Sequence, residues 1–281
     1  FSSRGQHTIF VSDWGSDVCS SGLYTLAMQP PVDLIRLART LGDPNLGCCV
    51  LAEGNVSARI EEATLWVKAS GHEMAEIGAS GFVALNLGGV LSLLEGGPES
   101  PAEVRRMLDN CRANPRARER PSTESFMHAY LLQLPGVRFV AHTHPESLLS
   151  LACLPSAEEF AKRRLFPDEI VFCGRESVFV PYADPGIALA REIRPRVEAY
   201  RNAHGAAPKT IWLQNHGLIA LGATAKEALS ATLMSEKAAR VRLGALQTGE
   251  PVRWLTESEV DAIVTWPDEH YRLARIRGSE S

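Results

Sequence analysis

The 281-residue chain contains no run of about 18 or more apolar residues, so we expect no segment to span a membrane. It also lacks a basic block, and its net charge of −4 argues against nucleic acid as the main partner. Six arginines do gather between residues 105 and 120, but acidic residues and a proline interrupt them, which is typical of a solvated helix face and loop. The six cysteines show neither a C-x-x-C pair nor a disulfide spacing, which favours reduced thiols in a cytoplasmic enzyme.

The first 27 residues differ from the rest of the chain. They are rich in Ser and Gly, show no helical or strand period, and lack the basic start and apolar core of a signal peptide. Residues 12–22 resemble the peptide produced when sequencing-adapter DNA is translated in frame, which makes Met28 the natural start. We therefore expect residues 1–27 to be a disordered, non-native extension and residues 28–281 to form one domain.

Hydrophobic periodicity predicts a mixture of helices and strands. The chain is expected to begin with a helix over residues 32–42, followed by two short strands joined by a turn at residues 61–64. Residues 84–120 are expected to be mainly helical and then loop-like. The predicted strands are 52–60, 65–71, 137–143, 178–182 and 210–220, and the further helices are 121–132, 186–202, 225–247 and 257–277.

Three histidines carry the clearest chemical signal. His142 and His144 form an H-x-H motif on a predicted strand, where side chains alternate and both imidazoles point to one face. His216 follows in the motif Asn215-His-Gly217. Three imidazoles brought together by the fold match a catalytic zinc site, which keeps one coordination position open. The alternative is that they are ordinary histidines of a sheet, since histidine is moderately buried on average.

A carboxylate precedes the H-x-H motif. Glu124 is expected in the first turn of the helix over residues 121–132, where unpaired N–H groups and the helix dipole favour an anion. A capping carboxylate is the ordinary interpretation of this position. The helix leads directly to the strand with His142 and His144, however, so a helix–turn–strand hairpin would return Glu124 towards a metal. A carboxylate placed there can abstract a proton from carbon.

Small polar residues suited to an anion occur at three turns. Gly54 and Asn55 form a tight polar turn, Ser70 and Gly71 close a predicted strand, and two hydroxyl residues stand at a helix N-terminus. Each turn alone is ordinary. Their presence together with the histidines favours an anion site; the hydroxyl residues are Ser122 and Thr123.

In order and spacing these motifs resemble the class II aldolase/adducin family of zinc-dependent sugar-phosphate enzymes. The resemblance covers roughly residues 34–245. Within the family, the chain most resembles the aldolase part of rhamnulose-1-phosphate aldolase-type proteins. It lacks the G-x-G-x-x-G fingerprint of their dehydrogenase part. The motifs are Gly54-Asn-Val-Ser-Ala-Arg59, Lys68-Ala-Ser-Gly71, Pro121-Ser-Thr-Glu124, His142-Thr-His144 and Asn215-His-Gly217.

The resemblance implies a fold, a site and an activity. The fold is a three-layer α/β/α domain with a mostly antiparallel central sheet. The activity is that of a metal-dependent lyase in carbohydrate metabolism, an aldolase that cleaves a ketose 1-phosphate into dihydroxyacetone phosphate and an aldehyde by stabilising an enediolate. Glu124 becomes the acid/base. The zinc ligands become His142, His144 and His216, and the substrate-phosphate pocket becomes Asn55, Ser70, Gly71, Ser122 and Thr123.

The chain also departs from the family pattern. Ala52 replaces a hydroxyl residue often found in the phosphate pocket of these aldolases, which puts a phosphorylated substrate in question. An epimerase, a dehydratase or a decarboxylase on the same scaffold is the alternative activity. Family epimerases tend to carry Asp where Glu124 stands, which favours the aldolase. A scaffold role without catalysis, like that of adducin, is disfavoured by the intact histidines and Glu124.

For the identity of the metal and the oligomeric state, the sequence supports only general expectations. Three imidazoles do not distinguish Zn²⁺ from Mn²⁺, Co²⁺ or Fe²⁺. The resemblance implies a homo-oligomer, a cyclic tetramer in the family's enzymes, with the active site between adjacent subunits. The tail over residues 254–277 is the candidate for lying across a neighbour, because Trp266, Tyr271 and several arginines are typical interface anchors.

Overall fold

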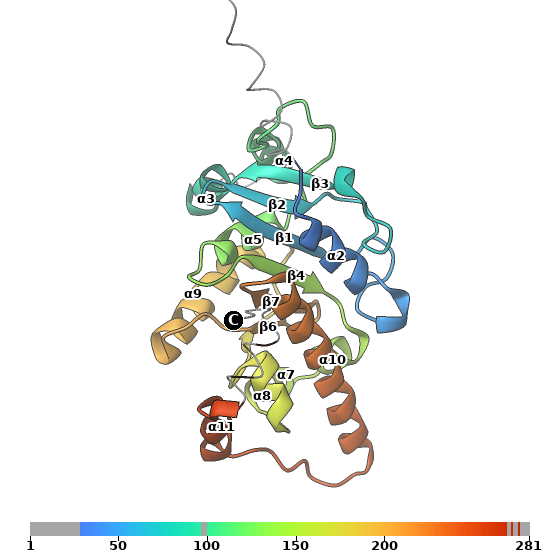
Figure 1. The fold of residues 1–281 in the computed structure, drawn as a ribbon, viewed down its shortest axis with the longest axis vertical. Helices are drawn as coiled ribbons and strands as arrows, with labels where there is room; N and C mark the ends of the chain where they lie inside the picture. The colour runs from blue at the N-terminus through green and yellow to red at the C-terminus, as the bar shows by residue number, and fades with distance from the viewer. Residues whose placement is uncertain (1–28, 97–99, 269–270, 272–274, 276–281) are drawn as a thin grey trace, which may run out of the picture.

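Helices cover both faces of a central sheet in the computed structural model, which describes residues 29–96, 100–268, 271 and 275 (Figure 1). Residues 1–27, expected to be a disordered extension, lie outside the described residues. The two faces of the sheet contact different helices, because side chains alternate along each strand. Leu65 and Val67 belong to the core cluster that includes residues of α3 (Leu87–Gly96), α5 (Ser125–Leu132) and α9 (Ile187–His204), whereas Trp66 between them belongs to the cluster that includes residues of α2 (Val32–Leu41) and α10 (Ala225–Gln247). The expected three-layer α/β/α arrangement is therefore confirmed.

The sheet is mostly antiparallel. Its strand order over the described residues is β3-β2-β1-β4-β7-β6-β5. The pair β5 and β6 is parallel, and the other neighbouring strands are antiparallel. The strands are β1 (Asn55–Glu61), β2 (Thr64–Lys68), β3 (Phe82–Asn86), β4 (Phe139–Thr143), β5 (Val178–Val180), β6 (Thr210–Leu213) and β7 (Gly217–Gly222).

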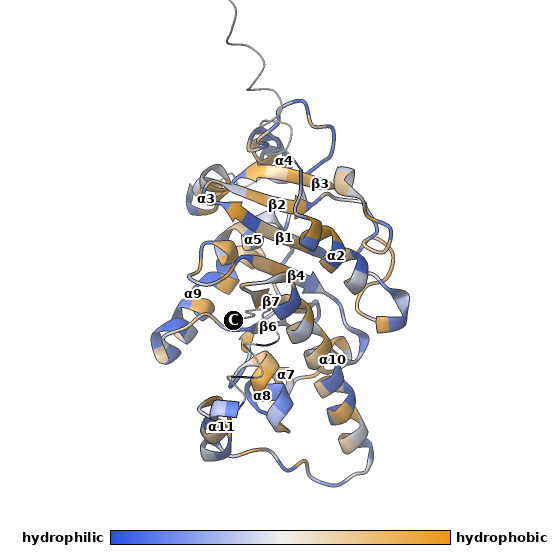
Figure 2. Cartoon of the chain, viewed as in Figure 1, coloured by the Kyte–Doolittle hydropathy of each residue, from blue (hydrophilic) through white to orange (hydrophobic). Residues whose placement is uncertain are grey.

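The helices follow the apolar spacing of the sequence. In the first of them, Leu34, Leu37, Ala38 and Leu41 recur at helical intervals and are buried. The central strands are orange in Figure 2, whereas exposed stretches of the outer helices are blue. The helices are α2 (Val32–Leu41), α3 (Leu87–Gly96), α4 (Pro101–Asn110), α5 (Ser125–Leu132), α6 (Glu146–Ala152), α7 (Ala157–Lys162), α8 (Pro167–Cys173), α9 (Ile187–His204), α10 (Ala225–Gln247) and α11 (Glu257–Val264).

Three elements differ from the sequence-based expectation. The expected strand over residues 210–220 is two strands, β6 and β7, because residues 214–216 form a turn between them. Residues 82–86 form the strand β3, although residues from 84 onward were expected to be mainly helical. The last predicted helix, 257–277, is interrupted after α11 at residues 265–266, and the described residues beyond the break, 267, 268, 271 and 275, are helical again.

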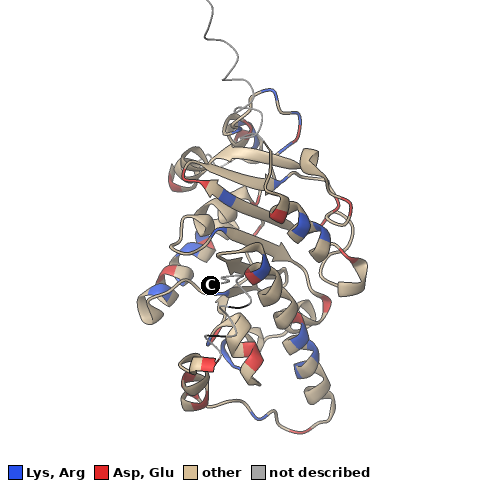
Figure 3. Ribbon diagram, in the orientation of Figure 1, with Lys and Arg blue, Asp and Glu red and all other residues tan. Residues whose placement is uncertain are grey.

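Most charged residues lie on the helices and loops. In Figure 3 the blue and red segments are scattered over these elements, while the strands are mostly tan. Within the described part of the chain, no helix has the length and apolarity needed to cross a membrane.

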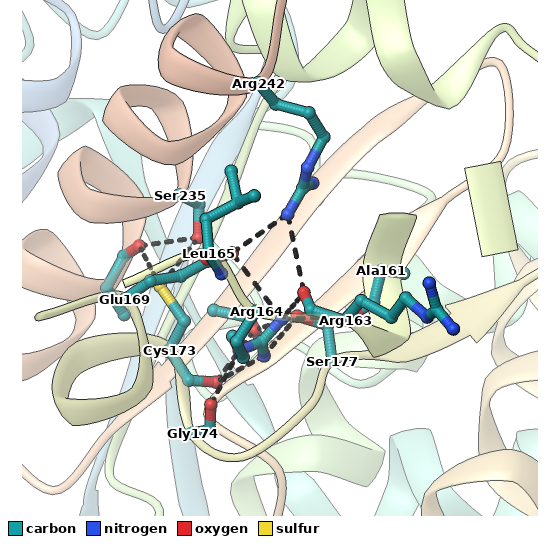
Figure 4. A network of polar contacts seen from close by, with 12 residues as sticks. Ala161, Arg163, Arg164, Leu165, Glu169, Cys173, Gly174, Ser177, Ser235 and Arg242 are labelled. Carbon is teal, nitrogen blue, oxygen red and sulfur yellow. Dashed lines mark hydrogen bonds and ion pairs between the residues drawn. The ribbon is translucent and has the colours of Figure 1, made fainter. Parts of the chain in front are cut away.

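A buried arginine network joins α10 to α8 and to the segment after α7 (Figure 4). Nη2 of Arg242 lies 3.2 Å from Oε1 of Glu169, and the Arg242 guanidinium lies 5.1 Å from the ring centre of Trp254. The Leu255 N–H donates to the Arg164 carbonyl at 3.0 Å, and Asp261 of α11 pairs with Arg175. The start of the tail therefore packs on its own chain, and the expectation that the tail lies across a neighbour stays a prediction.

Candidate metal centre

Three histidines from two neighbouring strands converge. His142 lies on β4 and His144 directly follows that strand, while His216 lies in the turn between β6 and β7. Because β7 pairs with β4, the turn brings His216 beside the other two rings. The ring centroids are 4.9 to 5.1 Å apart, and the potential ligand nitrogens all lie within 4.8 Å of one another.

The backbone around His216 permits this convergence. Asn215 has a left-handed conformation with φ of 55°, which Asn tolerates better than most residues. Gly217 follows at a close contact with the end of β4. A Cβ atom there would lie 2.8 Å from Cδ2 of His144 and closer still to the Thr143 carbonyl oxygen. The Asn-His-Gly sequence is therefore needed for the turn and not only for the imidazole.

Partners at Nδ1 orient two of the imidazoles. Nδ1 of His142 donates to the Leu218 carbonyl at 3.0 Å, because a carbonyl can only accept. Nδ1 of His144 lies 3.2 Å from Oε2 of Glu53, which also accepts. In the neutral rings both Nε2 atoms are then unprotonated, and they face each other at 3.1 Å. Two facing lone pairs at this distance repel, and a bound cation would remove the repulsion.

Burial keeps the rings of His142 and His216 in the form that binds a metal. It holds the pKa of His142 well below 6.5, and the neighbouring His144 and His216 lower it further. Burial also lowers the pKa of His216, and the nearby Glu124 carboxylate opposes this shift. Neutral imidazole is the ligand form, so these two residues do not have to lose a proton at neutral pH before a metal binds.

Glu124 faces the same point. Its Oε1 atom lies 3.6 Å from Nε2 of His142 and 3.4 Å from Nε2 of His216. That oxygen is buried and has no hydrogen-bond partner among the described residues. Glu124 is the N-cap residue of α5 with helical backbone angles, whereas the sequence predicted it inside the first turn. Its side chain makes no capping bond, so the ordinary capping interpretation does not apply.

The donor set fits a divalent metal. Three imidazoles, with a buried carboxylate oxygen that lacks a donor beside them, form a closely spaced group of lone pairs. Such a group is unfavourable without a positive charge near its centre. Nitrogen ligands of this kind suit zinc and several other transition metals, so the donor set does not identify the ion.

Two of the turns expected to bind an anion lie side by side. Ala69 forms a bridge with Pro121, and the Ser70 N–H donates to the Arg120 carbonyl at 2.9 Å. These contacts join the end of β2 to the segment before α5. The residues brought together in this way are Ser70, Gly71, Ser122 and Thr123.

Three of these residues, Ser70, Gly71 and Thr123, are exposed at this edge. Gly71 has φ of 85° and is exposed, and a Cβ added there would meet no atom within 4 Å. Thr123 is also exposed, whereas the Ser122 hydroxyl accepts from the Glu124 N–H at 3.2 Å. Asn55, the fifth residue expected in the pocket, is buried, and its Nδ2 donates to Glu124 at 2.6 Å. Its structural position differs from that of the other four.

Sequence reasoning missed other residues near the centre. Glu53 contacts His144 from 91 positions away, and no local pattern indicates this pairing. Lys68 is buried and donates to the Ala52 carbonyl at 3.1 Å, and burial lowers its pKa. His128 lies one helical turn after Glu124, an i, i+4 spacing that was a usable signal.

Comparisons with known proteins agree with this geometry. A model of the Class II Aldolase and Adducin N-terminal domain matches residues 32–243. Among curated proteins, the uncharacterized oxidoreductase YuxG of Bacillus subtilis (strain 168) is 28% identical over 193 residues, which is 66% of this chain and 25% of that protein. The chain thus spans about a quarter of the length of that curated relative.

Solved structures share the fold. The N-terminal class II aldolase domain of a conserved protein from Thermoplasma acidophilum is 26% identical with a TM-score of 0.60, covering 84% of this chain and 100% of that one. An L-fuculose 1-phosphate aldolase is 18% identical with a TM-score of 0.63, covering 88% and 99%. YgbL of Klebsiella pneumoniae, described as an aldolase, epimerase or decarboxylase, is 21% identical with a TM-score of 0.61, covering 82% and 95%.

Proposed function

The chain belongs to the class II aldolase and adducin N-terminal domain family, and on this premise we propose that it is a metal-dependent aldolase acting on a ketose 1-phosphate. The observation that carries the proposal is the position of Glu124, whose Oε1 lies within 3.6 Å of two of three convergent histidines. An adducin-like scaffold has no need of this arrangement. The products would be dihydroxyacetone phosphate and an aldehyde.

The three histidines would hold the metal. His142, His144 and His216 each present a nitrogen to one small volume, and Zn²⁺ is the ion we propose. When bound, it would supply Lewis acidity to oxygen atoms of the substrate. The Leu218 carbonyl and the Glu53 carboxylate keep two of the rings oriented for this role.

Glu124 would move the proton. In the cleavage direction the C4 hydroxyl of the ketose loses its proton to solvent, the C3–C4 bond breaks with its electron pair remaining on C3, and C4 leaves as the aldehyde carbon. C3 then has to gain a proton, and the Glu124 side chain is the carboxyl group nearest the centre that can deliver it. In the synthetic direction the same carboxylate removes that proton. Its partial burial limits competition from bulk water.

Four turn residues would bind the phosphate. Ser70, Gly71, Ser122 and Thr123 lie on two joined segments that lead directly to Lys68 and Glu124. Their N–H and hydroxyl groups can donate to an anion without a charged side chain. We also propose that residues 28–281 form one domain and that the enzyme is a homo-oligomer, most simply a tetramer.

A substrate panel tests the proposal. Purified protein is first analysed for bound metal, then incubated with ketose 1-phosphates and the matching unphosphorylated ketoses, and the products are identified by NMR. We expect one equivalent of metal and retro-aldol cleavage of a phosphorylated ketose. An inverted stereocentre, a lost water or released CO₂ would instead indicate the epimerase, dehydratase or decarboxylase alternative. A metal-free protein inert towards the whole panel would overturn the proposal.

A further inference from the structure

A continuous chain of hydrogen bonds leads from Glu124 into the protein core. Oε2 of Glu124 accepts from Nδ2 of Asn55 at 2.6 Å, and Oδ1 of Asn55 contacts Nε2 of His128. Nδ1 of His128 then lies 2.6 Å from the hydroxyl of Ser57. Asn55 is 4% exposed, and His128 and Ser57 are fully buried.

The elements explain why these four residues meet. Asn55 and Ser57 are two positions apart on β1, so their side chains lie on the same face of the sheet. Glu124 and His128 are four positions apart at the start of α5, so they lie on one face of the helix. The first turn of α5 therefore faces the start of β1, and the side chains of Glu124 and His128 contact those of Asn55 and Ser57.

The direction of each hydrogen bond follows from the chemistry of the groups. The Glu124 carboxylate accepts, so the Asn55 amide must turn its nitrogen towards Glu124 and its oxygen towards His128. That oxygen can only accept, so Nε2 of His128 carries the proton. In a neutral ring Nδ1 is then an acceptor, and the Ser57 hydroxyl donates to it. Every member has a defined role, so the chain has one consistent arrangement of protons.

The surroundings favour a neutral His128. The ring is fully buried, and burial lowers its pKa to about 3, with a further contribution from His142. Glu124 opposes the shift but touches Asn55 and not the His128 ring. A protonated ring would also lose its acceptor and leave the buried Ser57 hydroxyl without a partner on that side.

We propose that His128, in its neutral Nε2–H form, is a positioning residue that fixes the Asn55 amide so that Asn55 holds the Glu124 carboxylate against the metal centre. The inference rests on the proposed function for its catalytic consequence. It assigns Asn55 to the carboxylate and not to the substrate phosphate. Without His128 the amide could rotate and present its oxygen to Glu124, which would repel the carboxylate from its place.

The histidine tautomer is the first test, and it needs no activity. In protein with ¹⁵N-labelled histidine, two-bond ¹H–¹⁵N correlation spectra distinguish Nε2–H, Nδ1–H and doubly protonated rings, and the spectrum of His128→Gln identifies the His128 signals. We expect the Nε2–H form at neutral pH, with and without added Zn²⁺. An Nδ1–H or doubly protonated ring would overturn the proposal, whatever reaction the enzyme catalyses.

Kinetics of matched variants form the second test. His128→Phe removes the donor to Asn55, whereas the amide of His128→Gln can donate to Asn55 and accept from Ser57. We expect kcat to fall by about 10- to 100-fold in His128→Phe, as misplacement of a catalytic group does, and to return to within about fivefold of wild type in His128→Gln. The KM for a phosphorylated substrate and the metal content should stay within about twofold.

A control variant and a double variant separate positioning from general damage. His204, at the end of α9, contacts Glu176 and no member of this chain of hydrogen bonds, so His204→Gln should leave kcat unchanged. Asn55→Ala combined with His128→Phe should be no slower than Asn55→Ala alone, because both changes break one chain. A raised KM with unchanged kcat in Asn55→Ala would overturn the inference and return Asn55 to the phosphate pocket.

Discussion

The Glu53 carboxylate lies 3.2 Å from Nδ1 of His144, while Nε2 of the same ring faces Nε2 of His142 at 3.1 Å. Glu53 therefore orients the His144 ring through Nδ1 and leaves Nε2 available to a metal. The same carboxyl group accepts from the Val50 N–H at 2.6 Å, which fixes its own position. Hydrogen bonds of this kind orient metal-binding histidines and raise their basicity.

Replacing Glu53 should weaken the metal site without removing a ligand. We expect Glu53→Gln to lower affinity for Zn²⁺ by about 10- to 100-fold, because His144 loses a charged acceptor at Nδ1. Competition with a chromogenic chelator measures the change. Glu73→Gln, an exposed carboxylate nearby in the chain, is the control and should bind as wild type does. Equal affinity in the two variants would show that Glu53 does not support the ligand.

Glu124→Gln should separate proton transfer from metal binding. The amide keeps the size of the side chain but cannot deliver or remove a proton, so turnover should fall by about a hundredfold or more. Metal content should remain near one equivalent, since the three imidazoles are intact. Steady-state kinetics and metal analysis on the same sample measure both. An unchanged cleavage rate would assign the proton transfer to another group.

The positions of the three histidines could be predicted only in part from the sequence. His142 and His144 share a face because strand alternation is a local rule, and the motif alone shows it. The turn that carries His216 was instead predicted as the middle of one long strand, because apolar residues flank it on both sides. Asn215 and Gly217 are the local signals for that turn, and they are weaker than the apolar run.

Contacts across the sheet were harder to predict. The pairing of β1 with β4 puts Asn55 opposite His142, and it also explains how residues near Gly54 come close to the histidines. Such a register depends on tertiary packing and not on local periodicity. The strand β3 was missed for a related reason, since Leu87 continues its apolar run directly into α3.

Gly217 should be intolerant of a side chain. The added methyl of Gly217→Ala would press against the Thr143 carbonyl and the His144 ring, so the start of β7 would have to move. We expect a loss of about 1 to 3 kcal/mol in the free energy of unfolding, together with weaker metal binding. Urea unfolding and chelator competition measure the two effects. Gly244→Ala on α10, where a Cβ meets no atom within 4 Å, is the matched control.

His128 should make the metal-free protein sensitive to acid. Its pKa is about 6.5 when unfolded and about 3 when folded, so the unfolded state takes up the proton first as the pH falls. Stability is therefore complete above pH 6.5 and decreases towards pH 3, by about 1.4 kcal/mol for each unit of pKa difference that is traversed. Asn55 and Ser57 contact the ring, and His142 and Glu124 act on it electrostatically.

Urea unfolding as a function of pH checks this contribution. His128→Gln does not titrate, so its free energy of unfolding should fall less between pH 6.5 and 4 than that of wild type. His142 remains in both proteins and contributes equally to both curves. Parallel curves for the two proteins would show that His128 does not carry this pH dependence.

The tail beyond α11 should govern assembly more than metal binding. Residues up to Val264 are held on their own chain by contacts that include the Asp261–Arg175 pair, whereas Trp266 and Tyr271 are 50% and 67% exposed. Exposed aromatic residues of this size are typical anchors of an interface between copies of a chain. We expect the variant ending at Thr265 to bind Zn²⁺ as the full chain does and to shift from the proposed tetramer to smaller species. Light scattering with parallel metal analysis measures both, and an unchanged mass in the shortened protein would exclude this tail from the interface.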